Sequence, residues 1–185
     1  MGMKISDTEI SGLKLIETSF VADHRGSFSR WFCMKELEPI LAGRGLAQIN
    51  NSRSLKAGTI RGLHFQRPPS AEMKIVRCIG GRVWDVALDI RAGSPTFLQW
   101  FGVELTPENN LMLAVPEGFA HGYQSLEPES ELLYFNTEFY TPEFEGAVNH
   151  ADPLAAIKWP VPVTDLSDRD ANAPFLTEEF KGLKI

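Results

Sequence analysis

One histidine that could carry chemistry lies in a short segment between two turn signals. The segment RGLHFQ places Arg61, His64 and Gln66 between a turn at Ala57-Gly58 and the break at Pro68-Pro69. Histidine is the side chain whose charge changes near neutral pH. A lone histidine in such a place is usually a hydrogen-bonded structural residue, so this segment alone does not establish catalysis.

A second histidine ends a motif with a recognisable spacing. In PEGFAH, residues 116–121, His121 completes the PxGxxH spacing of the second cupin motif, in which a tight turn delivers a histidine into the mouth of a barrel. Metal-binding cupins also carry an HxH pair and a nearby glutamate in their first motif. The four histidines here are all separate, at His24, His64, His121 and His150. The sequence therefore predicts no transition-metal site.

The residues around these motifs have the pattern of short β-strands. Residues 74–91, KIVRCIGGRVWDVALDIR, contain two β-rich runs on either side of Gly80-Gly81, which predicts a hairpin. In the second run Trp84, Val86 and Leu88 alternate with more polar positions, as in a strand with one buried face. Turn-rich stretches separate further apolar runs, at 97–105, 111–115 and 131–140. This spacing predicts an all-β sandwich or barrel.

Helices are a minor part of the prediction. Apolar residues at helical spacing indicate a short helix over 34–41, and a second short helix is expected over 177–183. The Pro-rich stretch 159–163 is expected to be an extended tether to a C-terminal appendage. A chain of 185 residues has the length of one domain. We therefore predict a single domain over residues 1–185, with the appendage beginning at about residue 160.

Composition and charge narrow the class of protein. Apolar residues make up 43% and charged residues 23%, which is a soluble globular profile. The net charge of −6 argues against a nucleic-acid-binding surface but allows a local basic pocket for phosphate. We find neither a secretory leader pattern nor an apolar run of about 20 residues that could span a membrane. Cys33 and Cys78 form no CxxC pair. We expect a cytoplasmic protein with free thiols.

Several motifs occur together in one order along most of the chain. They are DHRGSF, NNSRSLKAGTIRGLHFQ, KIVRCIGGRVWDVALDIRAGSPTF, VPEGFAHGYQSL, ADPLAAIKWP and LSDRD. In this combination the chain resembles the dTDP-4-dehydrorhamnose 3,5-epimerase family of sugar-nucleotide epimerases. The resemblance implies a cupin fold, which is an all-β double-stranded β-helix or jelly roll, with a few short peripheral helices. It also implies that the protein uses no cofactor.

The resemblance further implies an activity in deoxysugar biosynthesis. Family members invert carbon 5, carbon 3 or both in a 4-keto-6-deoxyhexose attached to a nucleoside diphosphate. Such chemistry needs a base on one face of the sugar, a stabiliser for the enolate oxygen and an acid on the other face. By resemblance, His64 is the base and Asp170 holds its imidazole in the correct tautomer. Lys74 would stabilise the enolate, and Tyr134 would return a proton to the opposite face.

The resemblance also assigns residues that hold the substrate. Arg61 and His121 are expected to line the pocket and help hold the diphosphate and the sugar. Further pocket or nucleotide-side residues implied in the same way are Gln48, Asn50, Arg25 and Tyr140. Family members are dimers that exchange an N-terminal strand, so the resemblance implies a homodimer in which Arg25 acts across the interface.

One position departs from the family pattern and bears on the nucleotide. The pattern DxRGxFxE usually ends in glutamate, whereas DHRGSFSR has Arg30 at that position. Thymine carries a ring N–H that a carboxylate can accept, cytosine offers a lone pair there, and arginine can only donate. If Arg30 faces the base, the exchange predicts a CDP-linked rather than a dTDP-linked substrate. The alternative is that Arg30 points to solvent or binds a phosphate.

Two other functional classes stay open from the sequence. One is a non-catalytic cupin that binds a sugar nucleotide, which would fit the loss of one of the four residues proposed for catalysis; all four are present. The other is a ketoisomerase or a metal-dependent cupin oxygenase, and the oxygenase needs metal ligands that this chain lacks. The residue set does not decide whether one carbon or both are inverted.

Overall fold

The computed structural model describes residues 2–185, and strands make up most of its regular structure. The strands are β1 (Met3–Asp7), β2 (Lys14–Thr18), β3 (Phe20–Asp23), β4 (Gly26–Ser29), β5 (Gln48–Ser54), β6 (Ile60–Gln66), β7 (Lys74–Gly80), β8 (Val83–Asp89), β9 (Trp100–Leu105), β10 (Leu111–Val115), β11 (Phe119–Ser125), β12 (Ser130–Asn136) and β13 (Glu145–Ala147). The helices are α1 (Met34–Leu41), the short 3-10 helix η1 (Pro142–Phe144) and α2 (Asp168–Ala171). The helix predicted over 34–41 is confirmed as α1.

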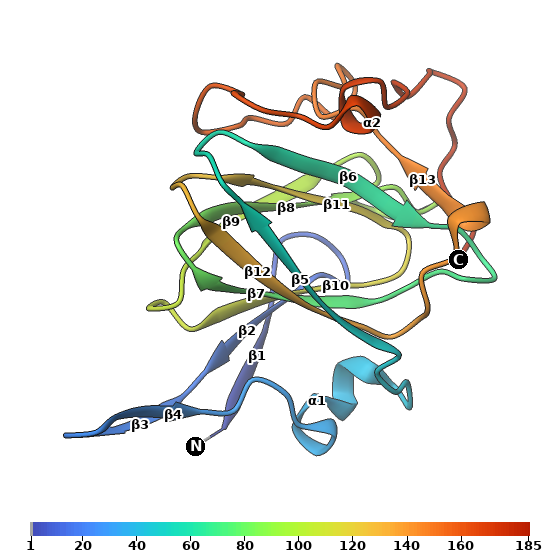
Figure 1. Cartoon of the computed structure of the whole chain (residues 1–185). Coiled ribbons are helices and arrows are strands. Elements are labelled where there is room, and N and C mark those ends of the chain that lie inside the picture. The colour runs from blue at the N-terminus through green and yellow to red at the C-terminus, as the bar shows by residue number, and fades with distance from the viewer. Residues whose placement is uncertain (1) are drawn as a thin grey trace.

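Two antiparallel sheets form a sandwich (Figure 1). The six-stranded sheet has the order β1-β2-β10-β7-β12-β5, and the five-stranded sheet has the order β13-β6-β11-β8-β9. Strands that follow each other in the chain, such as β6 and β7 or β11 and β12, lie in different sheets. This repeated crossing between two layers is the jelly-roll arrangement. The predicted all-β cupin-type fold is confirmed.

The hairpin predicted around Gly80-Gly81 is wrong in its pairing. β7 pairs with β10 and β12 in one sheet, whereas β8 pairs with β9 and β11 in the other. Both edges of each strand are therefore occupied by other partners. The two glycines make a sharp corner between the sheets, with Gly81 at φ +66°. A Cβ at Gly81 would lie 2.6 Å from Ser130 Oγ, so the corner itself requires glycine.

The hydrophobic core lies between the sheets, and a second apolar layer covers the outside of the six-stranded sheet. Val76 of β7 packs in the inner layer against Tyr123 of β11. Its neighbour Ile75 points the other way and packs with Leu37 and Leu41 of α1. Because successive side chains of a strand alternate between faces, β7 is buried on both sides.

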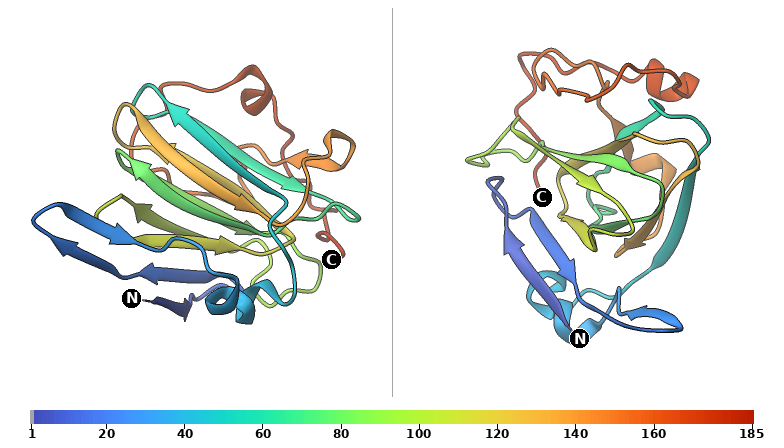
Figure 2. Two further views of the ribbon diagram at one scale, coloured as in Figure 1. Left: turned by 60° about the horizontal axis from the view of Figure 1, so that its bottom comes forward. Right: turned by 90° about the vertical axis from the view of Figure 1, so that its left-hand side faces the viewer.

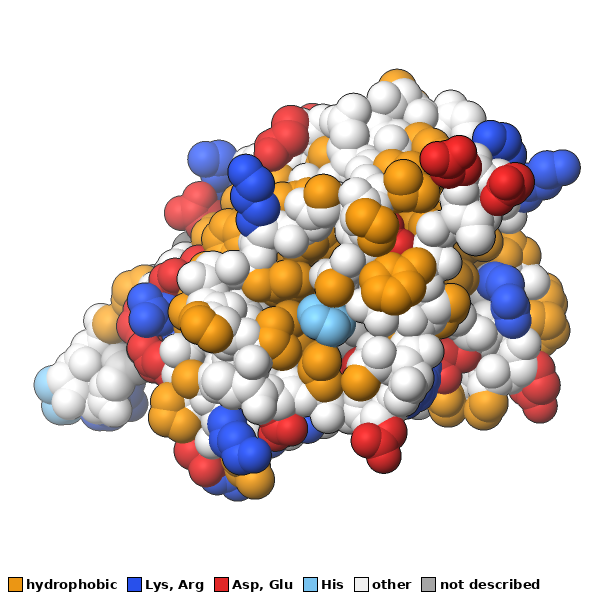
Figure 3. All heavy atoms as spheres, turned by 90° about the horizontal axis from the view of Figure 1, so that it is seen from above, with side chains coloured by type: hydrophobic (Ala, Val, Ile, Leu, Met, Phe, Trp, Pro, Cys, Tyr) orange, Lys and Arg blue, Asp and Glu red, His pale blue; other side chains and the backbone are white. Residues whose placement is uncertain are grey.

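Residues 148–185 run across the outside of the five-stranded sheet (Figures 1 and 2). Val86 and Leu88, on the predicted apolar face of β8, pack against Trp159 and Leu176 of this segment. Two backbone hydrogen bonds attach it to the start of β6: Thr164 N–H donates to Gly58 O, at 3.0 Å, and Ile60 N–H donates to Asp165 O, at 3.1 Å. Figure 3 looks onto this segment, where apolar side chains lie in the middle of the face and most charged side chains near its edges.

The helix predicted over 177–183 is wrong. This stretch contains a turn and then an isolated parallel bridge between Arg91 and Leu183. Leu183 N–H donates to Ile90 O at 2.6 Å, and Ala92 N–H donates to Leu183 O at 2.7 Å. Backbone pairing with a distant strand end has therefore overridden local helical spacing. No helix within residues 2–185 has both the length and the apolar character needed to cross a membrane.

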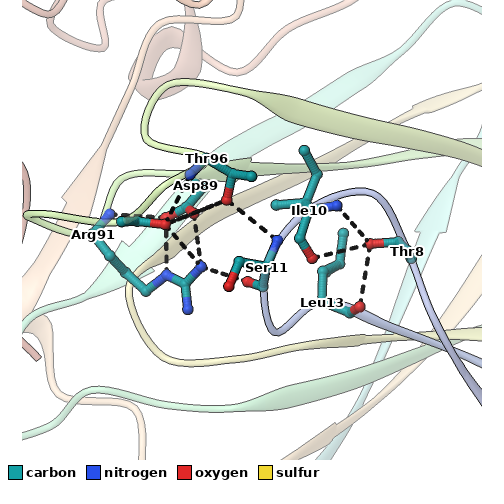
Figure 4. A network of polar contacts seen from close by, with 8 residues as sticks. Thr8, Ile10, Ser11, Leu13, Asp89, Arg91 and Thr96 are labelled. Atoms are coloured by element: carbon teal, nitrogen blue, oxygen red, sulfur yellow. Dashed lines mark hydrogen bonds and ion pairs between the residues drawn. The ribbon is translucent and has the colours of Figure 1, made fainter.

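A buried carboxylate ties two loops together at one end of the sandwich (Figure 4). The side chain of Asp89 is fully buried and accepts hydrogen bonds from Arg91 Nη2 at 2.7 Å, Ser94 Oγ at 2.5 Å and Thr96 Oγ1 at 2.7 Å. Arg91 Nη2 also donates to Ser11 O at 2.5 Å, in the loop between β1 and β2. Burial is the largest influence on the pKa of Asp89 and raises it, but these hydrogen bonds together outweigh burial and hold that pKa below its ordinary value.

Candidate active site

A histidine and an aspartate that lie far apart in the sequence meet at the edge of β6. His64 Nε2 lies 2.6 Å from Asp170 Oδ1. The second carboxylate oxygen, Oδ2, accepts the Gly62 N–H at 3.2 Å. Asp170 belongs to α2, where its own N–H donates to Ser167 Oγ, the N-cap of that helix, at 3.1 Å. The structure thus brings together the pair that the resemblance implied.

The environment of Asp170 favours its charged form. The residue is only 3% exposed. Burial is the largest influence on the pKa of Asp170 and raises it, but the hydrogen bond from His64 and the N–H of Gly62 outweigh burial, so the pKa of Asp170 lies below its ordinary value. The carboxylate is therefore ionised at neutral pH and can stabilise a positive charge on the imidazole of His64.

A close crossing of two strands sets the position of His64. In the register of the five-stranded sheet His64 is opposite His121 of β11. Gly62 has φ +126°, and a Cβ there would lie 2.5 Å from the Cα of Gly122. Glycine at these positions lets the two strands approach more closely than side chains would allow.

Lys74 begins β7, in the opposite sheet, and is tethered by an acid. The residue is 8% exposed, and its Nζ lies 2.8 Å from Glu72 Oε1. The other oxygen of Glu72 accepts a hydrogen bond from Asn136 Nδ2 at 2.8 Å. Asn136 Oδ1 in turn accepts from Asn50 Nδ2 at 3.2 Å. Sequence reasoning missed Glu72 and Asn136, although the acid stands only two residues before the lysine.

Tyr134 lies on β12 beside a second histidine–aspartate pair. Its ring meets the ring of His121 edge to face, with 6.1 Å between centroids. His121 Nε2 lies 3.0 and 3.1 Å from the two carboxylate oxygens of Asp85, which is completely buried. Burial is also the main reason why the pKa of the Tyr134 phenol is raised well above its ordinary value. The phenol is therefore protonated at neutral pH and can act as a proton donor.

These side chains line one cavity of about 560 Å³, a size typical of small-molecule sites. Of the predicted site residues, those on its wall are Asn50, Arg61, His64, Lys74, His121, Tyr134 and Asp170. Residues on the wall that sequence reasoning did not single out include Ser52, Thr59, Asp165, Ser167 and Arg169. His64 comes from the five-stranded sheet, whereas Lys74 and Tyr134 come from the six-stranded sheet. The cavity is thus approached by ionisable groups from both layers.

Gln48 and Tyr140 lie next to the cavity rather than on its wall. Gln48 Oε1 accepts the N–H of Tyr140 at 2.5 Å. The Tyr140 hydroxyl donates to Glu145 Oε2 at 2.7 Å. Glu145 Oε1 lies 2.5 Å from Nη2 of Arg169, which lines the cavity. These two predicted residues therefore reach the site through Glu145 and Arg169.

Arg25 and Arg30 are not on the cavity wall of this chain. Arg25 lies in the turn of the β3–β4 hairpin, where its guanidinium pairs with Asp23 at 2.6 Å. Arg30 follows β4, and its Nη1 lies 2.6 Å from Glu36 Oε1 of α1. The other oxygen of Glu36 accepts the N–H of Met3 at 2.8 Å. The geometry gives Arg30 a local structural partner.

Within the described part of the chain, no three or more His, Cys, Asp or Glu side chains gather in a way that could hold a metal ion. The two histidines of the cavity each have a carboxylate partner instead.

Comparison with known proteins places this site in a family context. The family model described as dTDP-4-dehydrorhamnose 3,5-epimerase matches residues 7–178. A protein of that name from Sinorhizobium fredii is 41% identical over 187 residues, covering 99% of this chain and 96% of the relative. One from Salmonella typhimurium is also 41% identical, covering 95% of this chain and 97% of the relative. The crystal structure of the Legionella pneumophila dTDP-6-deoxy-D-glucose-3,5-epimerase in complex with dTDP-4-keto-L-rhamnose superposes with a TM-score of 0.91 at 40% identity, covering 99% of this chain and 98% of that one.

Proposed function

Because the chain belongs to the dTDP-4-dehydrorhamnose 3,5-epimerase family, we propose that it inverts carbons 3 and 5 of a dTDP-linked 4-keto-6-deoxy sugar. One observation carries the proposal. His64, held by the buried Asp170, and the protonated Tyr134 reach the same cavity from the two facing sheets. A base and an acid on different sides of a sugar ring are what inversion at a carbon requires.

In the proposed reaction His64 removes the proton from the carbon next to the ketone. Because Nε2 is held by Asp170, the free nitrogen of the imidazole is Nδ1, and this atom takes the proton. The electron pair moves to the keto oxygen, and the ammonium of Lys74 stabilises the resulting enolate. Tyr134 then delivers its proton to the other face of the same carbon. Each inversion leaves an imidazolium at His64 and a phenolate at Tyr134. Proton exchange with water in the cavity returns both groups to their starting states before the next inversion.

The charges that form on the base and on the substrate each meet a group of the protein itself. Asp170 faces the imidazolium, and Lys74 faces the enolate. We therefore expect turnover without an added metal ion and without sensitivity to a chelator. Loss of turnover in a chelator, with recovery on addition of one divalent ion, would contradict this part of the proposal.

The proposed nucleotide is dTDP. The prediction of a CDP-linked substrate required Arg30 to face the base, and Arg30 instead pairs with Glu36 beside β1. The geometry of one chain thus gives that prediction no support, whereas the Legionella relative is described in complex with a dTDP sugar. We expect tighter binding of dTDP than of CDP, in the unmodified protein and in Arg30→Glu. A preference for CDP that Arg30→Glu reverses would restore the earlier prediction.

The proposed assembly is a homodimer in the cytoplasm. β1 and β2 pair within the chain's own sheet, whereas the β3–β4 hairpin pairs with neither large sheet and projects from the sandwich in Figure 1, where a second copy could bind it. Its apolar side chains are exposed, with Phe20 54%, Val21 60% and Phe28 65% exposed. Arg25 lies in the turn of this hairpin and would then reach the partner's nucleotide site. Sedimentation of the protein and of Phe28→Asp tests this: we expect a dimer that the substitution weakens.

The free thiols of Cys33 and Cys78 fit a reducing compartment.

The reaction is tested in heavy water with a dTDP-linked 4-keto-6-deoxyglucose. NMR follows deuterium at carbons 3 and 5 and the configuration of each carbon. We expect deuterium at both carbons together with inversion, and loss of both signals in His64→Ala. Inversion at one carbon alone would make the protein a monoepimerase. Binding of the nucleotide sugar without any exchange would indicate a non-catalytic cupin.

A further inference from the structure

The proposed reaction poses a problem at Tyr134. This phenol must give up a proton inside the protein, where burial disfavours the phenolate that results. Nearby Tyr123 and Asp85 add to the same effect, so the pKa of the phenol is raised well above its ordinary value. A useful acid at this position needs donors that stabilise the phenolate oxygen as it forms.

A second tyrosine links the two sheets directly behind this position. Tyr123 of β11 is fully buried. Its hydroxyl reaches across the sandwich to β5, where it lies 2.9 Å from Ser52 Oγ and 2.8 Å from Ser54 Oγ. Arg61 Nε donates to Ser54 Oγ at 3.3 Å. Three hydroxyls and a guanidinium are therefore connected in one line.

The partners of Ser54 set the direction of this line. Arginine has donors and no acceptor, so the Ser54 oxygen accepts from Arg61. Within residues 2–185 the other hydrogen-bond partner of this buried hydroxyl is Tyr123, so Ser54 can use its proton only by donating to the Tyr123 oxygen. Tyr123 then donates its proton to the Ser52 oxygen. The Ser52 hydroxyl proton is left with no acceptor among these four residues.

Ser52 is positioned to donate a hydrogen bond to Tyr134. Ser52 is opposite Leu132 in the register of β5 and β12, two residues from Tyr134 on the same face. Ser52 and Tyr134 both line the cavity. A side-chain hydrogen bond from Ser52 and the charge of Arg61 both lower the pKa of Tyr134 against the larger effect of burial.

We infer that Arg61, Ser54, Tyr123 and Ser52 form a one-way chain of hydrogen-bond donors that ends on the Tyr134 oxygen and stabilises the phenolate. Tyr123 is then a positioning residue: it does not touch the substrate, but it turns the Ser52 hydroxyl toward Tyr134. Hydrogen bonds in such a chain polarise one another, so breaking the middle weakens the last bond. This inference rests on the proposed function, because it concerns the acid of that reaction.

The test compares two rates in one sample of Tyr123→Phe. Deuterium exchange at the substrate carbon reports His64, whereas inversion also needs the proton of Tyr134. A hydrogen bond to a charged oxygen is commonly worth a factor of about 10 to 100 in rate. We therefore expect inversion to fall about tenfold or more relative to exchange. A tyrosine that only tied the sheets together would lower both rates by the same factor, and that outcome would overturn the inference.

Two further variants keep the test decisive if Tyr123→Phe folds poorly. Ser52→Ala removes only the last donor and should change the ratio of the two rates in the same way. Adding Ser52→Ala to Tyr134→Phe should not reduce inversion further, since Ser52 is expected to act on the oxygen that Tyr134→Phe removes. A further reduction would count against the chain. Ser130→Ala is the matched control, because it removes a buried hydroxyl that bonds only to Arg82 and Glu127.

Failure of the inference can be told apart from failure of the proposed function. If the unmodified protein shows no inversion, the proposed function fails and takes the donor chain with it. If the unmodified protein inverts its substrate and Tyr123→Phe keeps the same ratio of inversion to exchange, only the donor chain fails.

Discussion

Replacing Asp170 with asparagine changes one oxygen into an NH₂ group and tests the base directly. In the structure Oδ2 of Asp170 accepts the Gly62 N–H, and Oδ1 faces His64 Nε2. The amide of asparagine keeps its oxygen on Gly62, because that N–H needs an acceptor. The NH₂ group then faces His64 and donates to Nε2. The imidazole proton must move to Nδ1, which removes the lone pair that takes the substrate proton in the proposed reaction.

The expected loss follows from this change of tautomer. The same change in another carboxylate–histidine pair lowers turnover by about 10⁴-fold, so we expect a loss of about 10³- to 10⁴-fold here, or about 4 to 5 kcal/mol in the barrier. Turnover and substrate dissociation constants are measured together, and binding should change little. Urea unfolding checks that the fold is kept. The control is Asp168→Asn, an exposed aspartate in the same helix. More than a tenth of normal turnover in Asp170→Asn would refute the tautomer argument.

Three other outcomes are expected. Tyr134→Phe should lose inversion while His64-dependent exchange with solvent persists, as NMR in heavy water would report; equal loss of both would make the tyrosine structural. Glu72→Gln removes the charge that tethers Lys74 and should lower turnover about tenfold with a smaller effect on substrate affinity, which a titration and a rate measurement separate. Asp89→Asn should cost about 1–3 kcal/mol at pH 7 in urea unfolding. Because the pKa of Asp89 is held below its ordinary 3.8 in the folded chain, its contribution is present above that pH and is lost as the pH falls further, so the variant should lose less stability on acidification than the unmodified protein.

Local patterns in the sequence predicted which segments form helices and strands better than they predicted which segments pair with one another. The helix at 34–41 and the strand-rich middle of the chain follow from spacing alone. Gly80-Gly81 correctly marked a reversal, but two glycines fit a hairpin and a corner between sheets equally well. What decided between them was the occupation of both edges of β7 and β8 by distant strands. The end of the chain failed as a helix for the same kind of reason, because Leu183 pairs with residues near Arg91.

In the candidate site, too, the sequence indicated individual residues better than their spatial partners. His64 and Asp170 are separated by 106 positions, so no spacing rule could pair them, and only the resemblance did so. Their geometry depends on how the segment after β13 lies against β6. Glu72 stood beside Lys74 in the sequence and was still missed, since an acid near a lysine on a strand is common and usually exposed. Glu72 stands out because its side chain is largely buried with that of Lys74, and the sequence pattern did not reveal that burial.

The place of Asp170 in the chain has a consequence for synthesis on the ribosome. Every strand of the sandwich, with His64, Lys74 and Tyr134, precedes residue 148 in the order of translation. The carboxylate that orients His64 emerges later, on a segment that attaches to the start of β6 through a few backbone hydrogen bonds. The chain leaves the ribosome from its N-terminal end. In the proposed reaction, the acid and the enolate-stabilising lysine therefore leave the ribosome before the carboxylate that orients the base, so we expect the catalytic set to be incomplete until α2 has left the exit tunnel.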